Sequence, residues 1–386
     1  MKNFFYYLKH YGDVDFVQRP FCEVDAMLLS HVVYLGFDEY LQIDGAPERL
    51  ADLDTEEILN TLCATVPTPK RDRKLWLAMT KSKRYRDCKL FCHVDDVDVD
   101  EEGQFAAVTF LFDGFSVVTY RGTDLTLLGW KEDFNMSYLT EIPSQRRAVR
   151  YLKYVASLTD GTLYVCGHSK GGNLAIYAAV KNLDDYGDRI RGVYNFDGPG
   201  FPYDIANDPD YREHASKFHK YVPFGSTIGT LLYHTTDMHI VKSRGFGIEQ
   251  HLLYNWKFEG DGYLSYAKKF ALGVPLYEEI IKEWATRLST DEVKVFVDAT
   301  FDVLGAKDGV TLVDYFQKPK ATWLGVWRRS KLISRETRRL MFKTFRQFIH
   351  AIRVSERRIR HRNRDIRRKA RETRKLMFDL NRKKNQ

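Results

Sequence analysis

The chain has 386 residues, of which 44% are hydrophobic and 14% aromatic, so it can bury a large core and is neither wholly disordered nor collagen-like. The net charge of +8 hides two opposite parts, because residues 328–386 hold 23 Lys/Arg and five Asp/Glu, whereas residues 1–327 hold 37 Lys/Arg and 47 Asp/Glu. The five Cys are scattered and form no CxxC pair, and the N-terminus has no signal-like apolar segment, which together predict a reduced, cytoplasmic protein. No apolar run is long enough to predict a transmembrane helix.

Residues 1–100 are predicted to be mostly helical. Asp25 is the expected N-cap of AMLLSHVVYLGF, and Asp54 is expected to open TEEILNTLCATV, where Glu57 completes a capping-box pattern. We therefore interpret residues 1–100 as a helical N-terminal region that leads into the sheet.

The acidic segment HVDDVDVDEEG superficially resembles a calcium-binding loop. If Asp96 were position 1, position 6 would be Glu101 and position 12 would be Ala107, where calcium loops need Gly and a bidentate Glu. The two cysteines four residues apart, Cys88 and Cys92, have no second pair to complete a zinc site. We therefore expect no metal, and interpret the segment as an acidic edge before a hairpin.

Strand patterns begin at residue 104. QFAAVTFLF and FSVVTYRGT flank Asp113-Gly114, a strong hairpin signal. A helix from Ser144, the strand TLYVCG, the helix GGNLAIYAAVKNL and the strand IRGVYNFDGPG follow, and KFHKYVPFG and MHIVKS are two further strand candidates. The alternation predicts an α/β fold, a mostly parallel sheet with helices on both faces, as the core over residues 101–320.

Gly167-His168-Ser169-Lys170-Gly171 is the most informative motif in the chain, a G-x-S-x-G between an apolar strand and a helix. This is the context of a nucleophile elbow, whose sharp turn between strand and helix presents the serine at the start of the helix that follows. The helix N-terminus directs backbone N–H groups toward the place where an oxyanion forms. Ser169 is therefore the candidate nucleophile.

A serine nucleophile needs a base, and the base needs an orienting acid; in this fold class both follow the serine in the chain. Asp197 lies at a predicted strand end, directly before a Gly-Pro turn, and is the preferred acid, with Asp237 second. Asp204, Asp208 and Asp210 are further rivals, although Asp208 and Asp210 flank a proline in a polar loop.

His251 is the preferred base, because it follows a loop with two glycines that can carry a side chain over the carboxyl edge of the sheet. His234 is the weaker alternative, and His214, His219 and His239 are also downstream of the serine. His168 is expected to point away from the position that a base must occupy.

The backbone N–H groups of Thr123 and Lys170 are the candidate oxyanion donors. Lys170 follows the nucleophile, and Thr123 lies in an earlier strand-to-helix loop in which Gly122 allows close backbone approach. Arg121 and Asp133 are twelve residues apart across this loop, and we expect them to form an ion pair that holds it.

YRGT, then W-K-E-D-F, then GHSKGGNLA together resemble the class 3 lipase branch of the α/β-hydrolases, whose motifs read FRGT/S, W-x-x-D and GHSLGGALA. NFDGPG is similar to the acid-bearing turn of pancreatic lipases. The N-terminal segment, VPFGSTIGTLL and IVKS…EQHLLYNW resemble lipase-like proteins of Gram-positive bacteria, over about residues 1–320.

The resemblance implies Ser169 as nucleophile, His251 as base, and Thr123 with Lys170 as oxyanion donors. Two departures stand out: Lys170 replaces an apolar residue, and the place where class 3 lipases carry their acid reads VPFGSTIG, without a carboxylate. The expected activity is cleavage of a carboxylic ester through an acyl-enzyme, without a cofactor. The alternative is a non-catalytic hydrolase-fold protein that binds lipid, anionic membrane or a partner.

Residues 321–386 are predicted to be a basic helical tail. From Arg328 onward there is no Gly or Pro, and a helix of about 50 residues would reach roughly 75 Å. Its positive charge predicts contact with phosphates of an anionic membrane or a nucleic acid, which would place the protein peripherally at the membrane. The alternatives are a solvated helix and a clamp onto the acidic body.

Overall fold

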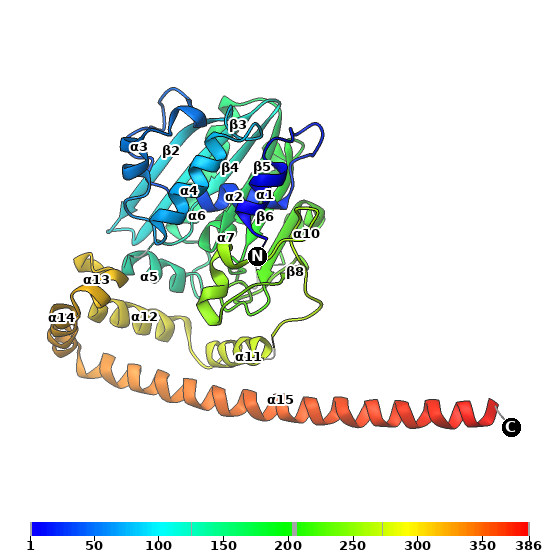
Figure 1. Ribbon diagram of the computed structural model, residues 1–386. Coiled ribbons are helices and arrows are strands. Elements are labelled where there is room, and N and C mark those ends of the chain that lie inside the picture. Colours follow the sequence, from blue (N-terminus) through cyan, green and yellow to red (C-terminus); the bar gives the residue numbers. More distant parts are fainter. Residues whose placement is uncertain (1, 125, 203–206, 272, 385–386) are drawn as a thin grey trace. The chain divides into compact units, whose positions relative to one another are not determined.

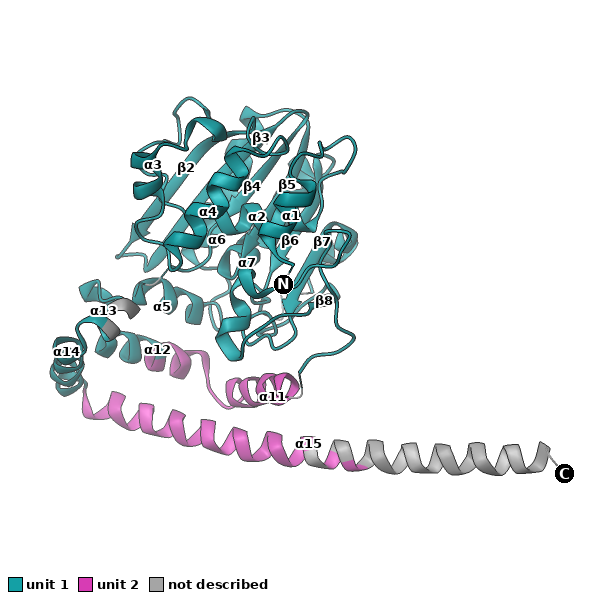
Figure 2. Cartoon of the chain, in the orientation of Figure 1, with its two compact units in different colours: residues 1–271, 297–333 teal, residues 272–296, 334–386 magenta. Residues whose placement is uncertain are grey.

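The computed structural model describes residues 2–124, 126–202, 207–271 and 273–384, with the side chains of residues 312, 313, 316, 360, 362, 363 and 365–384 excepted. The chain divides into two compact units (Figure 2). Unit 1 comprises residues 1–271 and 297–333, and unit 2 comprises residues 272–296 and 334–386.

Unit 1 is built around one eight-stranded sheet, in which the strands lie side by side in chain order (Figure 1). The pairs from β1 to β4 are antiparallel, and the pairs from β4 to β8 are parallel. The strands are β1 (Glu48–Arg49), β2 (Lys89–Asp98), β3 (Gly103–Phe112), β4 (Phe115–Tyr120), β5 (Thr162–His168), β6 (Ile190–Phe196), β7 (Phe218–Pro223) and β8 (Met238–Val241).

The hairpin predicted at Asp113-Gly114 is confirmed, since Phe112 pairs with Phe115 and Gly114 has the positive φ of 78° that this turn requires. The acidic segment before it is itself a strand, β2, which pairs with β3. The mostly helical stretch expected for residues 1–100 therefore ends earlier, and α4 (Pro69–Thr80) is its last helix.

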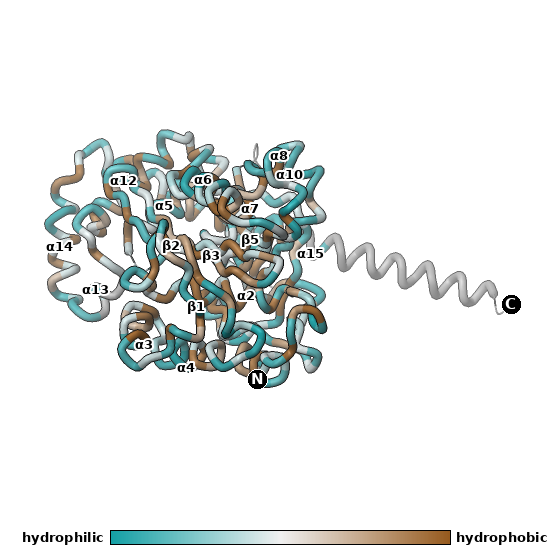
Figure 3. Tube along the Cα trace, turned by 90° about the horizontal axis from the view of Figure 1, so that it is seen from above, coloured by the Kyte–Doolittle hydropathy of each residue, from teal (hydrophilic) through white to brown (hydrophobic). Residues whose placement is uncertain are grey.

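Helices cover both faces of the sheet, as expected. One core contains residues of α1 (Phe4–Tyr11), α2 (Glu23–Val32) and α4, and the other contains residues of α6 (Pro143–Leu158) and α7 (Lys170–Val180). Successive side chains along a strand point to opposite faces of the sheet, so Val117 packs in the first core and Val118 in the second. Figure 3 shows hydrophobic residues gathered along the central strands.

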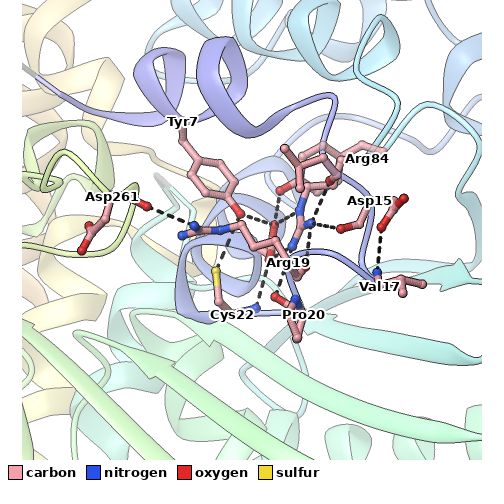
Figure 4. A network of polar contacts seen from close by, with 11 residues as sticks. Tyr7, Asp15, Val17, Arg19, Pro20, Cys22, Arg84 and Asp261 are labelled. Carbon is pink, nitrogen blue, oxygen red and sulfur yellow. Dashed lines mark hydrogen bonds and ion pairs between the residues drawn. The ribbon is translucent and has the colours of Figure 1, made fainter.

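The helix that contains Asp25 begins at Glu23, so Asp25 lies within its first turn and is not the N-cap. Its carboxylate is buried and accepts hydrogen bonds from Arg84 Nε at 2.7 Å, Arg84 Nη2 at 2.6 Å and Tyr7 Oη at 3.0 Å (Figure 4). The other end of the Arg84 guanidinium donates to the carbonyls of Val14 and Arg19. This network fixes the loop between α1 and α2.

Two other helix starts also differ by one or two residues. Thr55, not Asp54, caps α3 (Glu56–Leu62), because its hydroxyl accepts from Ile58 N, and α6 begins at Pro143. Short elements complete this part of unit 1: α5 (Leu127–Asn135), α8 (Leu183–Tyr186), α10 (Pro209–Glu213) and the 3₁₀ turns η1 (Leu50–Asp52), η2 (Ala215–Lys217), η3 (Gly247–His251) and η4 (Leu253–Asn255).

The C-terminal third is helical, and it ends in the long basic helix that the sequence predicts, α15 (Arg335–Lys384). The preceding elements are α11 (Val274–Ala285), α12 (Thr290–Leu304), η5 (Ala306–Asp308), α13 (Leu312–Gln317) and α14 (Pro319–Leu332). The tail is not one helix from Arg328, because Ser334 Oγ caps α15 by accepting from Thr337 N at 3.0 Å. Across the described helices, none is both long and apolar enough to cross a membrane.

Within unit 2, α15 packs along α11. Trp284 on α11 places its ring 5.3 Å from that of Phe348 on α15 and 5.8 Å from that of Phe296. Glu283 joins the same two helices, since it accepts from Arg287 on its own helix and from Arg358 on α15.

Candidate active site

Ser169 lies in the turn between β5 and α7 with φ 58° and ψ −133°, a backbone conformation that a residue with a side chain rarely adopts. The flanking glycines make this turn possible. A Cβ on Gly167 would lie 2.2 Å from the carbonyl oxygen of Gly171, and a Cβ on Gly171 would lie 2.1 Å from that of Tyr120. The elbow is therefore sterically closed to other residues at both positions.

Asp197 follows β6 and contacts His251, at the end of η3, across 54 residues of sequence. The distance from Asp197 Oδ2 to His251 Nδ1 is 2.7 Å, and Asp197 is fully buried. The other carboxylate oxygen, Oδ1, accepts from Ser226 Oγ at 2.6 Å and from Gly229 N at 3.0 Å. All of these contacts fix the direction of the carboxylate toward the imidazole.

The rival acids and the rival base lie in other surroundings. Asp237 is exposed directly before β8, and Asp208 caps α10. Asp204 lies outside the described residues. His234 Nδ1 is 2.9 Å from Nζ of the buried Lys220, whose amine also donates to Gly198 O at 2.7 Å, and burial lowers the pKa of Lys220 to about 7.

His168, the residue before Ser169, packs its ring 4.4 Å from that of His251. Its Nε2 lies 2.9 Å from the backbone carbonyl of His251, which can only accept, so Nε2 carries the proton. Burial and the neighbouring His251 lower the pKa of His168 well below its usual range, so the ring is neutral. Nδ1 is then an acceptor for Tyr34 Oη at 3.2 Å. The chain Tyr34–His168–His251 holds the backbone of the candidate base.

A second support comes from η4, the turn that follows His251. Tyr254 Oη donates to Asp72 Oδ1 at 2.7 Å, and the same carboxylate contacts His31 Nε2 at 2.7 Å and Thr68 Oγ1 at 2.8 Å. Burial raises the pKa of Asp72, but the hydrogen bonds from His31, Tyr254 and Thr68 outweigh it and hold that pKa below the usual range. The N-terminal helices α2 and α4 thereby anchor the segment that carries the base.

The loop after β4 approaches the elbow closely. A Cβ on Gly122 would lie 2.2 Å from Tyr34 Oη and 2.9 Å from the Cβ of Ser169. Thr123 Oγ1 donates to Asp133 Oδ2 at 2.6 Å, and burial raises the pKa of Asp133 to about 6. The expected ion pair between Arg121 and Asp133 is wrong, because Arg121 pairs with Asp95 on β2. Both residues flank Ala106 of β3: Asp95 is its strand partner, and the backbone N–H of Arg121 donates to its carbonyl.

The side chain of Lys170 points back into the protein. Its Nζ donates to Glu132 Oε2 at 2.6 Å and to Gln104 O at 2.9 Å. The side chains of Lys170 and Glu132 are both at most 1% exposed. Glu132 also accepts from the backbone N–H groups of Gln104 and Ser144, each at 3.0 Å. The pair ties the first turn of α7 to α5 and β3, and it leaves the backbone N–H of Lys170 at the helix N-terminus.

These contacts define what the site can do. Ser169 lies in a strained elbow, the preceding residue His168 packs its ring on that of His251, and a buried carboxylate contacts Nδ1 of the same histidine. A serine, a histidine and a carboxylate are the groups that a serine hydrolase uses. Within the described residues, no cluster of three or more His, Cys, Asp or Glu side chains could hold a metal ion. The sequence gives no sign of the supporting roles of His168, Tyr34 and Asp72, because the histidine and tyrosine residues that they contact lie at least 41 residues away.

The fold and this site define the chain as a lipase-like α/β-hydrolase. A family model described as Mbeg1-like matches residues 79–302, more than half of the chain. The protein therefore belongs to the Mbeg1-like family. The comparison with curated proteins gave no match.

Among solved structures, a mutant form of MDLA from Penicillium cyclopium is similar with 11% sequence identity and a TM-score of 0.39, over 62% of this chain and 82% of that one. The M37 lipase is similar with 15% identity and a TM-score of 0.34, over 54% of this chain and 69% of that one. At this distance, the fold assignment depends on the chain's own strand order.

Proposed function

We propose that the protein is a serine hydrolase that cleaves a carboxylic ester through an acyl-enzyme on Ser169. The observation that carries the proposal is the 2.7 Å contact between buried Asp197 and His251 Nδ1. It is supported by Ser169, which is held at positive φ directly after His168, whose ring packs 4.4 Å from that of His251. With Nδ1 donating to Asp197, Nε2 is the nitrogen that takes the proton from Ser169 Oγ as the oxygen attacks the ester carbon.

The remaining groups have roles in the same step. The backbone N–H groups of Thr123 and Lys170 would donate to the oxyanion of the tetrahedral intermediate. Protonated His251 then gives its proton to the leaving alcohol, and water, deprotonated by the same imidazole, releases the acid from Ser169. Asp197 stays ionised throughout and stabilises the imidazolium.

A fluorophosphonate probe tests whether Ser169 is activated. The wild type should be labelled and should hydrolyse short p-nitrophenyl esters, and Ser169→Ala should lose both, because removal of such a nucleophile costs on the order of 10⁶ in kcat. Ser157→Ala is the matched control, since Ser157 is exposed on α6 and donates only to Tyr154 O. Wild-type protein that neither reacts with the probe nor turns over esters would leave the non-catalytic binding role.

A further inference from the structure

Helix α14 has its polar side turned inward and its apolar side turned outward. Thr322 is buried and donates to Asp314 O at 3.1 Å. Arg329 donates to Val303 O at 2.9 Å, to Leu304 O at 3.2 Å and to Asp308 Oδ2 at 2.8 Å. All of these partners belong to unit 1, as α14 does (Figure 2). These contacts of α14 with its own unit are polar, the reverse of an ordinary surface helix, and they are joined by one ring contact, in which Trp323 packs edge-on against Tyr315 at 5.4 Å.

The outward face of α14 carries three large side chains in the open. Trp323 is 58% exposed, Trp327 is 55% exposed and Leu324 is 45% exposed. At 3.6 residues per turn these three side chains lie within an arc of about 100°. An exposed indole is unfavourable in water, and two on one helix face indicate a surface that another apolar phase covers. We call Trp323, Leu324 and Trp327, with the flanking Lys320 and Lys331, the α14 face.

The α14 face is also strongly basic. The 14 residues of α14 contain Lys320, Arg328, Arg329 and Lys331 and no Asp or Glu. Lys320 and Lys331 are exposed on the same side as the indoles, one toward each end, and Lys331 Nζ lies 3.3 Å from the centre of the Trp327 ring. Tryptophan and leucine flanked by lysine is the composition of helices that lie in the interface of a membrane.

We propose that the α14 face docks on an anionic lipid surface, with α14 parallel to the membrane plane. Indole rings settle at the boundary between headgroups and acyl chains, and each lysine near an anionic surface adds about 1 kcal/mol. A second copy of the chain fits the face poorly, because two such helices would bring like charges together. A nucleic acid would contact the lysines but would leave the apolar arc uncovered.

Vesicle binding by the full-length chain tests the proposal. Wild-type protein should co-sediment with phosphatidylcholine vesicles that contain phosphatidylglycerol, more weakly with pure phosphatidylcholine vesicles, and less as salt is raised. Trp323→Ala with Trp327→Ala should weaken binding on the order of 100-fold, since two apolar anchors are lost. Lys320→Gln with Lys331→Gln should weaken binding about 30-fold on anionic vesicles and little on neutral ones.

The matched control is Phe342→Ala with Phe345→Ala, which removes from α15 two aromatic side chains that are at least as exposed as the tryptophans, at 69% and 58%. This variant should bind as the wild type does. Brominated lipids should quench the tryptophan fluorescence of the wild type, and the Trp323→Ala, Trp327→Ala variant should lose this quenching. The substituted side chains are exposed, so circular dichroism should be unchanged.

Three results would overturn the proposal: wild-type protein that ignores anionic vesicles at low salt, unchanged binding by the double tryptophan variant, or a dimer in solution that this variant abolishes. The docking is independent of the proposed chemistry. Ser169→Ala should bind vesicles normally, and the α14 variants should keep their activity on soluble esters, so failure of either idea is seen separately.

Discussion

The buried pair between Lys170 and Glu132 offers the sharpest test of how the elbow is held. Lys170→Met keeps the backbone N–H that the chemistry needs but removes the ammonium, and so leaves a fully buried Glu132 carboxylate without its counter-charge. Breaking a buried pair in this way costs about 3–5 kcal/mol. Glu132 keeps its two backbone N–H donors at 3.0 Å, so we expect the lower end, about 3 kcal/mol.

Urea denaturation followed by circular dichroism measures this cost. Lys131→Met is the matched control, because Lys131 is just as buried as Lys170, at 1% exposure, but its partners Glu102 and Asp298 are 26% and 31% exposed. Water can solvate those carboxylates once the lysine is gone, so Lys131→Met should cost about 1 kcal/mol. The comparison separates a stranded buried charge from the simple loss of a lysine.

Fluorophosphonate labelling adds a second readout. Lys170→Met should label roughly 10–100-fold more slowly, because the first turn of α7 loses its tie to Gln104 O, whereas Lys131→Met should label normally. The double variant Lys170→Met, Glu132→Gln has no buried charge left. It should regain about half of the free energy of unfolding that Lys170→Met loses, and not all of it, because one backbone N–H group still loses its acceptor. Equal stability of Lys170→Met and Lys131→Met, or no recovery in the double variant, would refute the reasoning.

Three further outcomes are expected. Asp197→Asn should lower kcat by roughly 10²–10⁴. Asp237→Asn, at an exposed position, should leave steady-state rates within about twofold of the wild type. If the two variants behave the other way round, Asp237 is the acid. Arg84→Met should lower the free energy of unfolding in urea by about 3–5 kcal/mol, because it strands buried Asp25, and a loss below about 1 kcal/mol would contradict this. Burial raises the pKa of Asp133 to about 6, so the native state binds this proton more tightly than the unfolded chain. The free energy of unfolding of the wild type, relative to that of Asp133→Asn, should therefore fall between about pH 4 and pH 6–7 and stay constant at higher pH. Parallel curves of unfolding free energy against pH for the two proteins would contradict this expectation.

Local signals account for much of what the sequence could predict. The Asp113-Gly114 hairpin, the alternation of strands and helices and the long C-terminal helix all follow from turn residues, period and the lack of Gly and Pro. Asp197 and His251 could be singled out because a strand end and a glycine-containing loop place side chains at the carboxyl edge of a parallel sheet.

Contacts between distant segments could not be predicted in this way. Arg121 has acidic candidates on both sides in the sequence, and only the β2–β3 pairing brings Asp95 beside it. Asp25 belongs to a capping box as its N3 residue and not as the N-cap, since it accepts from Cys22 N at 3.0 Å, and burial next to Arg84 gives it a further partner that the sequence pattern does not show. The break at Ser334 depends on one hydroxyl within a run of strong helix formers. The cytoplasmic location and the phosphate contacts of the basic tail stay predictions.

The supports behind His251 have a practical consequence for anyone who works with a shortened form of this protein. The family match spans residues 79–302, and a fragment cut to those bounds would still contain the serine, the acid and the base. It would lack Tyr34, which orients His168, and Asp72, which receives Tyr254. Such a fragment would hold every group that the proposed reaction uses, but it would lack these contacts that hold the segment of His251. We therefore expect the smallest active piece of the chain to extend beyond the borders that similarity recognises.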